Sequence, residues 1–306
     1  MTPLLVLSEE DVIELLDMEG CIAAMEEALA ALERGEVTFP LRPMVRAPGE
    51  NHLLGMMPAY RGGERPLYSL KTVAVMPDNP ARGLDAHQGT VTLHDGVTGQ
   101  TLAVMNASPV TAIRTAAVTA VATRRLARED AKVLAIVGAG VEARSHLEAL
   151  HGFGEVRITS RTRDRAEALA QEFGASVAGS IEEALDGADV VALTTSANEP
   201  IIRREWLKQG AHLNAVGMGQ EIDQTTLQEG TLFVDRRESA EVEGKIDPLW
   251  IHAELGEVLV GSAAGRSSAD ELTVFRSLGI AVEDLFAAEY IVRRAEETGR
   301  GTTLDF

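Results

Sequence analysis

The chain has 306 residues, of which 45% are hydrophobic and 25% charged, the balance of an ordinary globular protein. Its formal net charge is −19, from 28 basic and 47 acidic residues. A surface of that sign repels phosphate backbones, so we expect no nucleic-acid partner. No apolar run approaches the length of a membrane span, and we expect no membrane partner. One cysteine and scattered histidines predict a cytoplasmic protein without a metal site.

The first part of the chain predicts two helices followed by a sheet. Ser8 precedes an apolar-periodic run, which is typical of a helix start, and a second helix is predicted over 18–33. Short apolar segments separated by turn residues then predict a mostly antiparallel sheet. These segments are 53–59, 67–75, 89–94 and 101–106, and an alanine-rich helix is predicted over 111–126.

Two basic residues in this part are candidates for function. Lys71 stands within an apolar strand, where burial is costly without a role or a partner. An exposed strand position is the alternative. Arg114 falls near the start of the predicted helix, where it opposes the macrodipole unless it faces an anion. A solvated surface arginine is the alternative for Arg114.

The region from residue 131 onward alternates strands and helices. Strands are predicted at 133–137, 155–160, 190–194, 212–216 and 231–234, and helices at 141–151, 163–173, 181–185 and 223–228. This alternation predicts a Rossmann-type, doubly wound parallel sheet. A long helix over 280–297 follows, and we expect it to return to the first domain. The predicted fold class is therefore α/β, with a discontinuous α+β domain of residues 1–114 and 280–306 beside a Rossmann domain of residues 115–279.

A glycine pattern follows the first strand of the predicted Rossmann sheet. Gly138, Gly140 and Ala143 have the spacing of a dinucleotide-binding turn. The helix that begins at Val141 would offer free N–H groups to phosphates. An ordinary turn between strand and helix is the alternative. Because ligands of such sheets bind at the carboxyl ends of strands, the loops at Thr194 and at Val216-Gly217 also become candidate cofactor contacts.

The end of the second strand indicates which nucleotide is bound. An acidic residue here would accept a hydrogen bond from the 2′-hydroxyl of NAD, but the sequence reads Ser160-Arg161-Thr162. Arg161 can pair with a 2′-phosphate, and the two hydroxyls can donate to it. We therefore expect NADP, while Asp164 leaves NAD possible.

These features together resemble the ornithine cyclodeaminase/mu-crystallin family over nearly the whole chain. The motifs that carry the resemblance are Pro40-Leu-Arg42, Leu54-Gly-Met-Met-Pro-Ala-Tyr60, Lys71, Gly89–Gly99, Ala103-Val-Met105, Thr111–Ala117, the turn at Gly138, His212–Gly217 and Ser277–Asp284. The resemblance implies a nucleotide-binding domain with bound NAD(P), a substrate-binding and dimerisation domain formed by residues 1–114 with 280–306, and a homodimer.

Residue roles follow from the same resemblance. Arg42 and Arg114 match arginines that bind the substrate carboxylate, and Lys71 matches a lysine at the reacting carbon. Cofactor-phosphate positions are matched by Thr115, Gly138, Gly140 and Ala143, and the 2′-phosphate position by Ser160, Arg161 and Thr162.

Two departures from the family pattern bear on the substrate. Cyclodeaminases resemble this chain but carry a glutamate where Gly55 stands, and an aspartate near Gly219. Glu221 and Asp223 lie close enough in sequence to the second position to remain candidates. Without those acids, a second substrate ammonium would lack a counter-charge, which is costly when buried.

The expected function is therefore NAD(P)-dependent hydride transfer at the α-carbon of a small amino or imino acid. Reduction of a ketimine or cyclic imino acid, or chemistry like that of alanine dehydrogenase, fits best. Conversion of ornithine to proline and ammonia is the first alternative. A non-catalytic protein that binds a small ligand in an NADP-dependent manner is the second.

Overall fold

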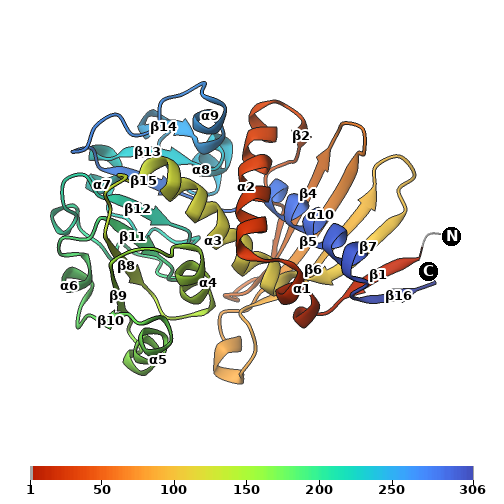
Figure 1. Ribbon diagram of the computed structural model, residues 1–306, viewed down its shortest axis with the longest axis horizontal. Helices are drawn as coiled ribbons and strands as arrows, with labels where there is room; N and C mark the ends of the chain where they lie inside the picture. The colour runs from red at the N-terminus through yellow and green to blue at the C-terminus, as the bar shows by residue number, and fades with distance from the viewer. Residues whose placement is uncertain (1–2, 306) are drawn as a thin grey trace. The chain divides into compact units, whose positions relative to one another are not determined.

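The computed structural model describes residues 3–305 and divides into two compact units (Figure 1). The first unit comprises Met1–Arg114 with Ile280–Phe306, and the second comprises Thr115–Gly279. The boundary falls inside helix α3 (Ala107–Leu126), so one uninterrupted helix contributes residues to both units.

The first unit is built on a mixed sheet. Its strands are β1 (Leu4–Leu7), β2 (Val37–Thr38), β3 (Met44–Arg46), β4 (Leu53–Arg61), β5 (Leu67–Val75), β6 (His87–Asp95), β7 (Thr101–Asn106) and β16 (Thr302–Leu304). They lie in the order β16-β1-β7-β6-β5-β4-β2, and β3 also pairs with β4. All neighbours are antiparallel except β1 and β7, which confirms the mostly antiparallel sheet predicted from the sequence.

Helices α1 (Glu9–Leu15), α2 (Met18–Glu33) and α10 (Ala281–Thr298) pack in this unit, which also contains the 3-10 turn η1 (Asn79–Arg82). Ser8 and Asp11 form the capping box expected at the start of α1. Helix α10 contacts β4, β5 and β6 and also packs on α2. It ends at Gly299, whose φ of 69° is left-handed and therefore favours glycine. The chain thus returns to the first sheet through α10.

The second unit is a parallel sheet. Its strands are β8 (Val133–Val137), β9 (Glu155–Thr159), β10 (Ser176–Val177), β11 (Val190–Leu193), β12 (His212–Ala215), β13 (Thr231–Val234), β14 (Ile251–Glu254) and β15 (Thr273–Arg276). Its further helices are α4 (Val141–Ala149), α5 (Arg163–Phe173), α6 (Ile181–Leu185), α7 (Gln224–Glu229), α8 (Arg237–Val242), α9 (Leu255–Val260), and the 3-10 turns η2 (Arg204–Trp206) and η3 (Pro248–Trp250).

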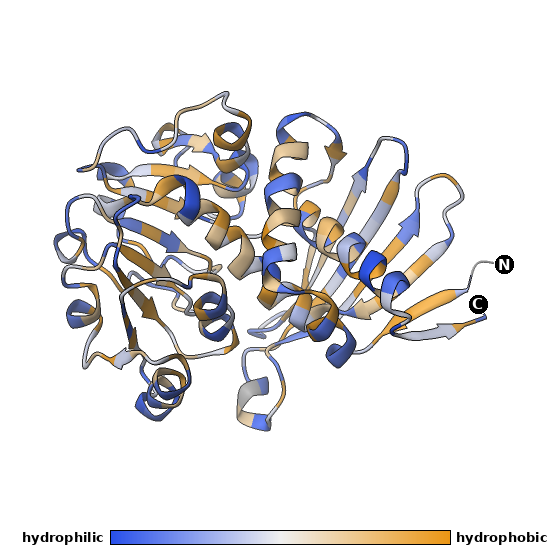
Figure 2. Ribbon diagram, in the orientation of Figure 1, coloured by the Kyte–Doolittle hydropathy of each residue, from blue (hydrophilic) through white to orange (hydrophobic). Residues whose placement is uncertain are grey.

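Strand order in the second unit is β10-β9-β8-β11-β12-β15-β13-β14. The chain runs outward from β8 in one direction and from β11 in the other, so the order reverses between these two strands. The residues of β11, β12 and β15 are all buried, as expected for strands covered on both faces. Figure 2 shows β11 in the hydrophobic colour and the outlying helices with more hydrophilic colour. The predicted Rossmann-type doubly wound fold is confirmed.

The start of α3 corrects one sequence prediction. The helix begins at Ala107 rather than Thr111, and the Asn106 side chain accepts a hydrogen bond from the Ser108 amide at 2.9 Å. Pro109 is tolerated in the first turn, where its missing N–H would have had no helical acceptor. Arg114 therefore lies two turns inside the helix, and the argument from an unfavourable macrodipole does not apply to it.

Within the described residues, no helix is both long enough and apolar enough to cross a membrane.

Candidate functional site

The side chain of Lys71 is buried at the centre of the first sheet. Lys71 pairs in register with Met57 on β4 and Val91 on β6, both of which are also buried. Side chains alternate along a strand, so these three share one face. Only 1% of the Lys71 surface is exposed. This burial rules out the alternative in which Lys71 occupies an exposed strand position.

Two residues on the helices hold the Lys71 ammonium. Its Nζ lies 2.7 Å from Oδ1 of Asp284, in the first turn of α10, and Asp284 is itself fully buried. The Thr111 hydroxyl on α3 lies 3.4 Å from the same nitrogen. A buried ammonium is stable only with such a counter-charge and hydrogen bonds.

Arg114 joins the same group from α3. Its Nη1 lies 2.8 Å from Oε2 of Glu283, and its Nε lies 3.5 Å from Oδ1 of Asp284. Only 5% of the Arg114 surface is exposed, so the solvated-arginine alternative is also wrong. Asp284 therefore stands between two cations, Lys71 and Arg114.

Burial lowers the pKa of Lys71 to about 8. The Asp284 carboxylate opposes this shift because it favours the charged amine, while the positive charges of Arg114 and Arg42 add to the lowering. An amine with a pKa near 8 can both give and take a proton near neutral pH.

Arg42 and His87 are the less buried members of the group. The Arg42 Cδ lies 3.6 Å from the point where a Cβ on Gly55 would stand, so Arg42 extends over this glycine. Desolvation, then the charges of Lys71 and Arg114, lower the pKa of His87. Because the His87 surface is exposed, the neighbouring cations are the stronger physical cause. The side of the cluster nearest Arg42 and His87 is the side open to solvent.

Three cations therefore act together with two buried carboxylates. Lys71, Arg114 and Arg42 carry positive charge, and Glu283 and Asp284 carry negative charge. The guanidinium groups of Arg114 and Arg42 match the geometry of a carboxylate. The first unit thus contains groups that could bind a carboxylate and supply a proton.

The glycine turn of the second unit follows β8. Gly138 has φ of 131°, and a Cβ added there would lie 2.4 Å from Oγ1 of Thr194. Thr194 follows β11 and donates hydrogen bonds from its amide and its hydroxyl to the Val137 carbonyl. The turn is therefore packed against the end of the neighbouring strand, at the point where strand order reverses.

The start of α4 is suited to a phosphate group. Among the described residues no side chain caps it, and the space beside Gly140 is open, with no heavy atom beyond its own chain neighbours within 4 Å of an added Cβ. Val141 is exposed, while Ala143 is fully buried against the sheet. Uncapped helical amides beside an open glycine can donate hydrogen bonds to a pyrophosphate. These residues fit the nucleotide predicted from the sequence.

The residues after β9 are exposed at the same edge of the sheet. Ser160 Oγ accepts a hydrogen bond from the Thr162 amide at 3.2 Å, and Arg161 is exposed. Arg163 is different because its Nε lies 2.7 Å from a carboxylate oxygen of Glu167. Among the described residues Arg161 makes no ion pair, so its guanidinium remains available for a phosphate.

Three further predicted cofactor positions lie elsewhere in the second unit, namely Thr115, Val216 and Gly217. Thr115 is buried in α3, and its carbonyl accepts from the Thr119 hydroxyl. Val216 follows β12, and its amide donates to the Leu193 carbonyl. A Cβ on Gly217 would lie 2.7 Å from the backbone carbonyl oxygen of Thr195, so a larger residue would clash there.

Glu221 and Asp223 have different positions. Asp223 is the N-cap residue of α7 and accepts from the Thr226 hydroxyl. Glu221 is 1% exposed, accepts from the Thr195 hydroxyl, and lies beside Gly217 at the carboxyl edge of β11 and β12. Burial raises the pKa of Glu221 to about 7, although the hydrogen bond from Thr195 opposes this shift. Of the two acids, only Glu221 is buried at that edge.

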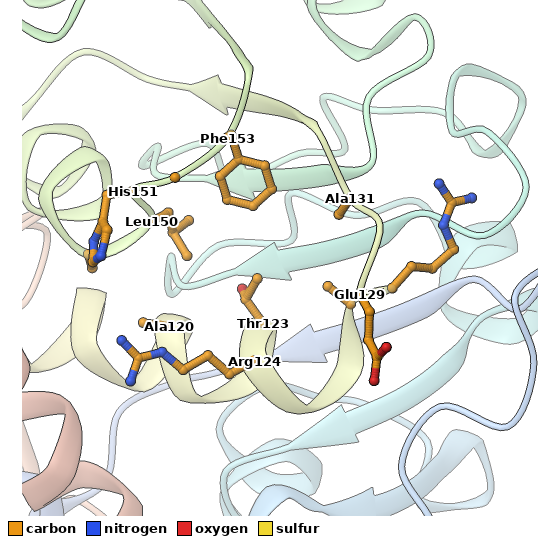
Figure 3. Close-up of a pocket in the computed structure, with 12 residues that line it drawn as sticks. Ala120, Thr123, Arg124, Glu129, Ala131, Leu150, His151 and Phe153 are labelled. Carbon is orange, nitrogen blue, oxygen red and sulfur yellow. The ribbon is translucent and has the colours of Figure 1, made fainter.

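A cavity of about 300 Å³ in the second unit is separate from the glycine turn (Figure 3). Its walls include Glu129 and Ala131 ahead of β8, and His151 and Phe153 ahead of β9. It therefore lies where these strands begin, whereas Gly138 and Ser160 follow their ends. Its Arg128 is already paired with Asp130 and Asp189.

Glu283 and Asp284 were given no role in the sequence analysis. The available signal was an adjacent pair of acids inside the otherwise apolar stretch Ala281–Ala288. Both are fully buried, and each contacts a predicted substrate-binding cation. Among the described residues no group of histidine, cysteine and acidic side chains could hold a metal ion.

Comparison with known proteins gives three close similarities. Ketimine reductase mu-crystallin of Mus musculus is 41% identical over 285 residues, covering 88% of this chain and 90% of the relative. The structure of Thermococcus litoralis Delta(1)-pyrroline-2-carboxylate reductase with NADH and L-proline has a TM-score of 0.91 at 32% identity, covering 97% of this chain and 99% of its own. An archaeal alanine dehydrogenase dimer with bound NAD has a TM-score of 0.92 at 31% identity, covering 99% of both chains. The model of the ornithine cyclodeaminase/mu-crystallin family matches residues 3–299, and the chain belongs to this family.

Proposed function

We propose that the protein is an NAD(P)-dependent reductase that adds a hydride to the α-carbon of a small imino acid, with a cyclic ketimine as its preferred substrate. The observation that carries this proposal is the buried group of Lys71, Arg114 and Asp284 in the first unit. The relatives support it, since two of them are a ketimine reductase and a pyrroline-2-carboxylate reductase.

The chain's own residues divide the work of binding and proton transfer. Arg114 and Arg42 would bind the substrate carboxylate and thereby orient the imine, which supplies much of the rate in such reactions. Lys71, with a pKa of about 8, would donate a proton to the imine nitrogen. The burial of Lys71 keeps bulk water from competing for that proton.

The second unit would hold the cofactor, which supplies the hydride. Gly138, Gly140, Val141 and Ala143 would contact its pyrophosphate together with Thr115, and Thr194, Val216 and Gly217 would border it at the strand ends. Ser160, Arg161 and Thr162 would bind a 2′-phosphate. Arg161 is exposed and forms no ion pair among the described residues, which supports NADP as the preferred form, with NAD as a weaker substitute.

Gly55 supports reduction over cyclodeamination. It lies under the Arg42 side chain, where the related cyclodeaminases place a glutamate. Glycine at this position leaves the distal ammonium of ornithine without that counter-charge. Glu221 is occupied with Thr195 inside the second unit. Cyclodeamination therefore has less support than reduction.

A homodimer is also proposed, through the face of the first sheet opposite Lys71. Side chains one position away in register point to that face, and among them Leu54 and Tyr68 are 39% and 49% exposed. The rings of Tyr60 and Tyr68 lie 4.7 Å apart there. A second copy of the chain would bury these apolar groups, and the similar alanine dehydrogenase is a dimer.

We also propose a cytoplasmic location. The single cysteine, Cys21, is fully buried in α2, and burial raises the pKa of its thiol. The fold therefore uses no disulfide and suits a reducing compartment.

The test is a spectrophotometric screen. NADPH or NADH is mixed with the protein and with five- and six-membered cyclic ketimine carboxylates, with pyruvate plus ammonia, or with no substrate. We expect NADPH to be consumed fastest with a cyclic ketimine. Tight NADPH binding without consumption on any substrate would instead identify a binding protein. Proline formed from ornithine with catalytic cofactor would identify a cyclodeaminase.

A further inference from the structure

The two carboxylate oxygens of Asp284 differ in their hydrogen bonding. The Lys71 Nζ donates a hydrogen bond to its Oδ1 at 2.7 Å, and the same oxygen lies 3.5 Å from Nε of Arg114. Its Oδ2 is buried and has no hydrogen-bond partner among the described residues. A buried carboxylate normally satisfies both oxygens, and leaving one unsatisfied is costly. An acid kept in this arrangement points to a task beyond packing.

Lys71 is unusual among the lysines of the chain. Only four of the 28 basic residues are lysines, namely Lys71, Lys132, Lys208 and Lys245. Lys132 and Lys245 are exposed, and Lys208 pairs with Asp189 near the surface. Arginine is the basic residue at nearly all other positions, yet a guanidinium cannot release a proton near neutral pH. The buried position facing Asp284 therefore has a lysine, whose ammonium can release a proton.

The charged groups that act on Lys71 come from several elements. Asp284 on α10 is the anion, Arg114 on α3 and Arg42 in the loop before β3 are cations, and His87 on β6 lies within reach of their charge. The facing positions Met57 and Val91 are apolar. Glu283 on α10 is a second buried acid of the cluster, but its printed contact is with Arg114, so among the described acids Asp284 is the one that touches the ammonium.

We infer that Asp284 positions the Lys71 ammonium for proton donation and sets the upper limit of the pH range in which the protein reduces an imine. This inference deepens the proposed function and rests on it. When hydride adds to the imine carbon, the C=N π electrons move to nitrogen and take a proton from Nζ. The N–H bond of the amine forms as the Nζ–H bond of Lys71 breaks. The neutral lysine regains its proton from solvent after the amine product has left the site.

The experiment compares the wild-type protein with Asp284→Asn and with the matched variant Glu283→Gln. Asp284→Asn keeps the side-chain volume and removes the charge beside Lys71. The pH at which half of kcat/KM is lost on the alkaline side should fall by about one unit or more, the size of effect that one adjacent charge produces. Glu283→Gln removes the neighbouring acid that contacts Arg114, so KM for the imino acid should rise while the alkaline limit stays in place.

A second readout follows Lys71 without any substrate. Protein labelled with ¹³C and ¹⁵N only in lysine gives four side-chain Nζ signals. In Asp284→Asn the Lys71 signal should titrate about one pH unit or more below its wild-type midpoint, while the Lys132, Lys208 and Lys245 signals stay unchanged. If Asp284→Asn does not fold, Asp284→Ser replaces it, because it also removes the charge beside Lys71 and should lower the Lys71 midpoint in the same way.

The two readouts separate failure of the inference from failure of the function. A Lys71 midpoint that is the same in Asp284→Asn and wild type would overturn the role of Asp284, whatever the substrate. A Lys71 midpoint that moves in Asp284→Asn while the alkaline limit of kcat/KM does not would also overturn it. No activity on any imine, with a midpoint that moves, would leave the Lys71–Asp284 coupling intact and refute the reductase proposal instead.

Discussion

Lys71 and Asp284 are separated by 213 positions in the chain, yet Nζ of the first lies 2.7 Å from Oδ1 of the second. Strand β5 supplies the amine, and α10 supplies the acid after the chain has passed through the whole second unit. Both are essentially excluded from solvent. A contact of this kind places an ionisable amine where its protonation is set by protein groups rather than by water.

Replacing Lys71 should abolish turnover and leave cofactor binding intact. Lys71→Met removes the proton donor, and loss of a positioned acid lowers rates by roughly a hundredfold or more. NADPH affinity, read by fluorescence titration, should change less than about twofold, because the nucleotide residues belong to the other unit.

Lys71→Arg is the matched control for that change. It keeps the positive charge beside Asp284 but supplies no proton near neutral pH. We expect it to fold with near-wild-type stability and to be as inactive as Lys71→Met. An active Lys71→Arg protein would mean that charge alone, and not proton transfer, is the contribution of Lys71.

The two glycines of the turn should respond differently to alanine. At Gly138 the added Cβ would lie 2.4 Å from Oγ1 of Thr194 at a φ of 131°, so Gly138→Ala should lower the free energy of unfolding by about 2 kcal/mol. At Gly140 an added Cβ would have no described heavy atom within 4 Å except in its chain neighbours, so Gly140→Ala should be as stable as wild type. It should nevertheless weaken NADPH binding, because its methyl group occupies the space intended for phosphate. Equal stability of the two variants would refute this reading of the turn.

Arg161 should determine the choice between the two nucleotides. Arg161→Ala should weaken NADPH binding by about tenfold or more, the usual effect of losing one charged hydrogen-bond partner, and leave NADH binding unchanged. Arg163→Ala is the matched control, because Arg163 already pairs with Glu167. A comparable loss for both cofactors in Arg161→Ala would argue that Arg161 does not contact the 2′-phosphate.

Glu221 should make stability fall with rising pH. Its pKa in the folded protein, about 7, lies above the ordinary value of 4.5. Below pH 4.5 the carboxyl is protonated in both states. As the pH rises from 4.5 to 7 the unfolded chain ionises first, so the folded state loses up to about 3 kcal/mol.

Glu221→Gln should remove that dependence. Urea unfolding of both proteins at pH 5 and pH 8 measures it, and the stability of the variant relative to wild type should rise by about 2 kcal/mol between these pH values. The same relative stability at both would show that Glu221 ionises normally in the folded protein.

The sequence identified what local pattern can encode. The glycine spacing at Gly138 and the strand containing Lys71 are short-range signals, and both elements are present in the structure. The start of α3 was placed at Thr111 rather than Ala107, because Pro109 hides the first turn of the helix. The burial of Lys71 remained open, since alternation along one strand does not reveal which face a distant helix will cover.

Local sequence patterns could not predict the acidic partners of Lys71 and Arg114. Glu283 and Asp284 look like ordinary acids in the first turn of a helix, where they favour the macrodipole. Only the return of α10 to β5 gives them their role. In the same way, β15 lies between β12 and β13 in the sheet. This order cannot be predicted from the order of the strands along the chain.

Isotope transfer to the product tests the central proposal most directly. The protein is incubated with Delta(1)-pyrroline-2-carboxylate and NADPH deuterated at C4 on the transferring face, and the proline formed is examined by mass spectrometry. We predict proline that carries one deuterium on its α-carbon. Proline without deuterium when each C4 face is labelled in turn, or no proline from an otherwise folded and NADPH-binding protein, would contradict hydride transfer to the imino acid.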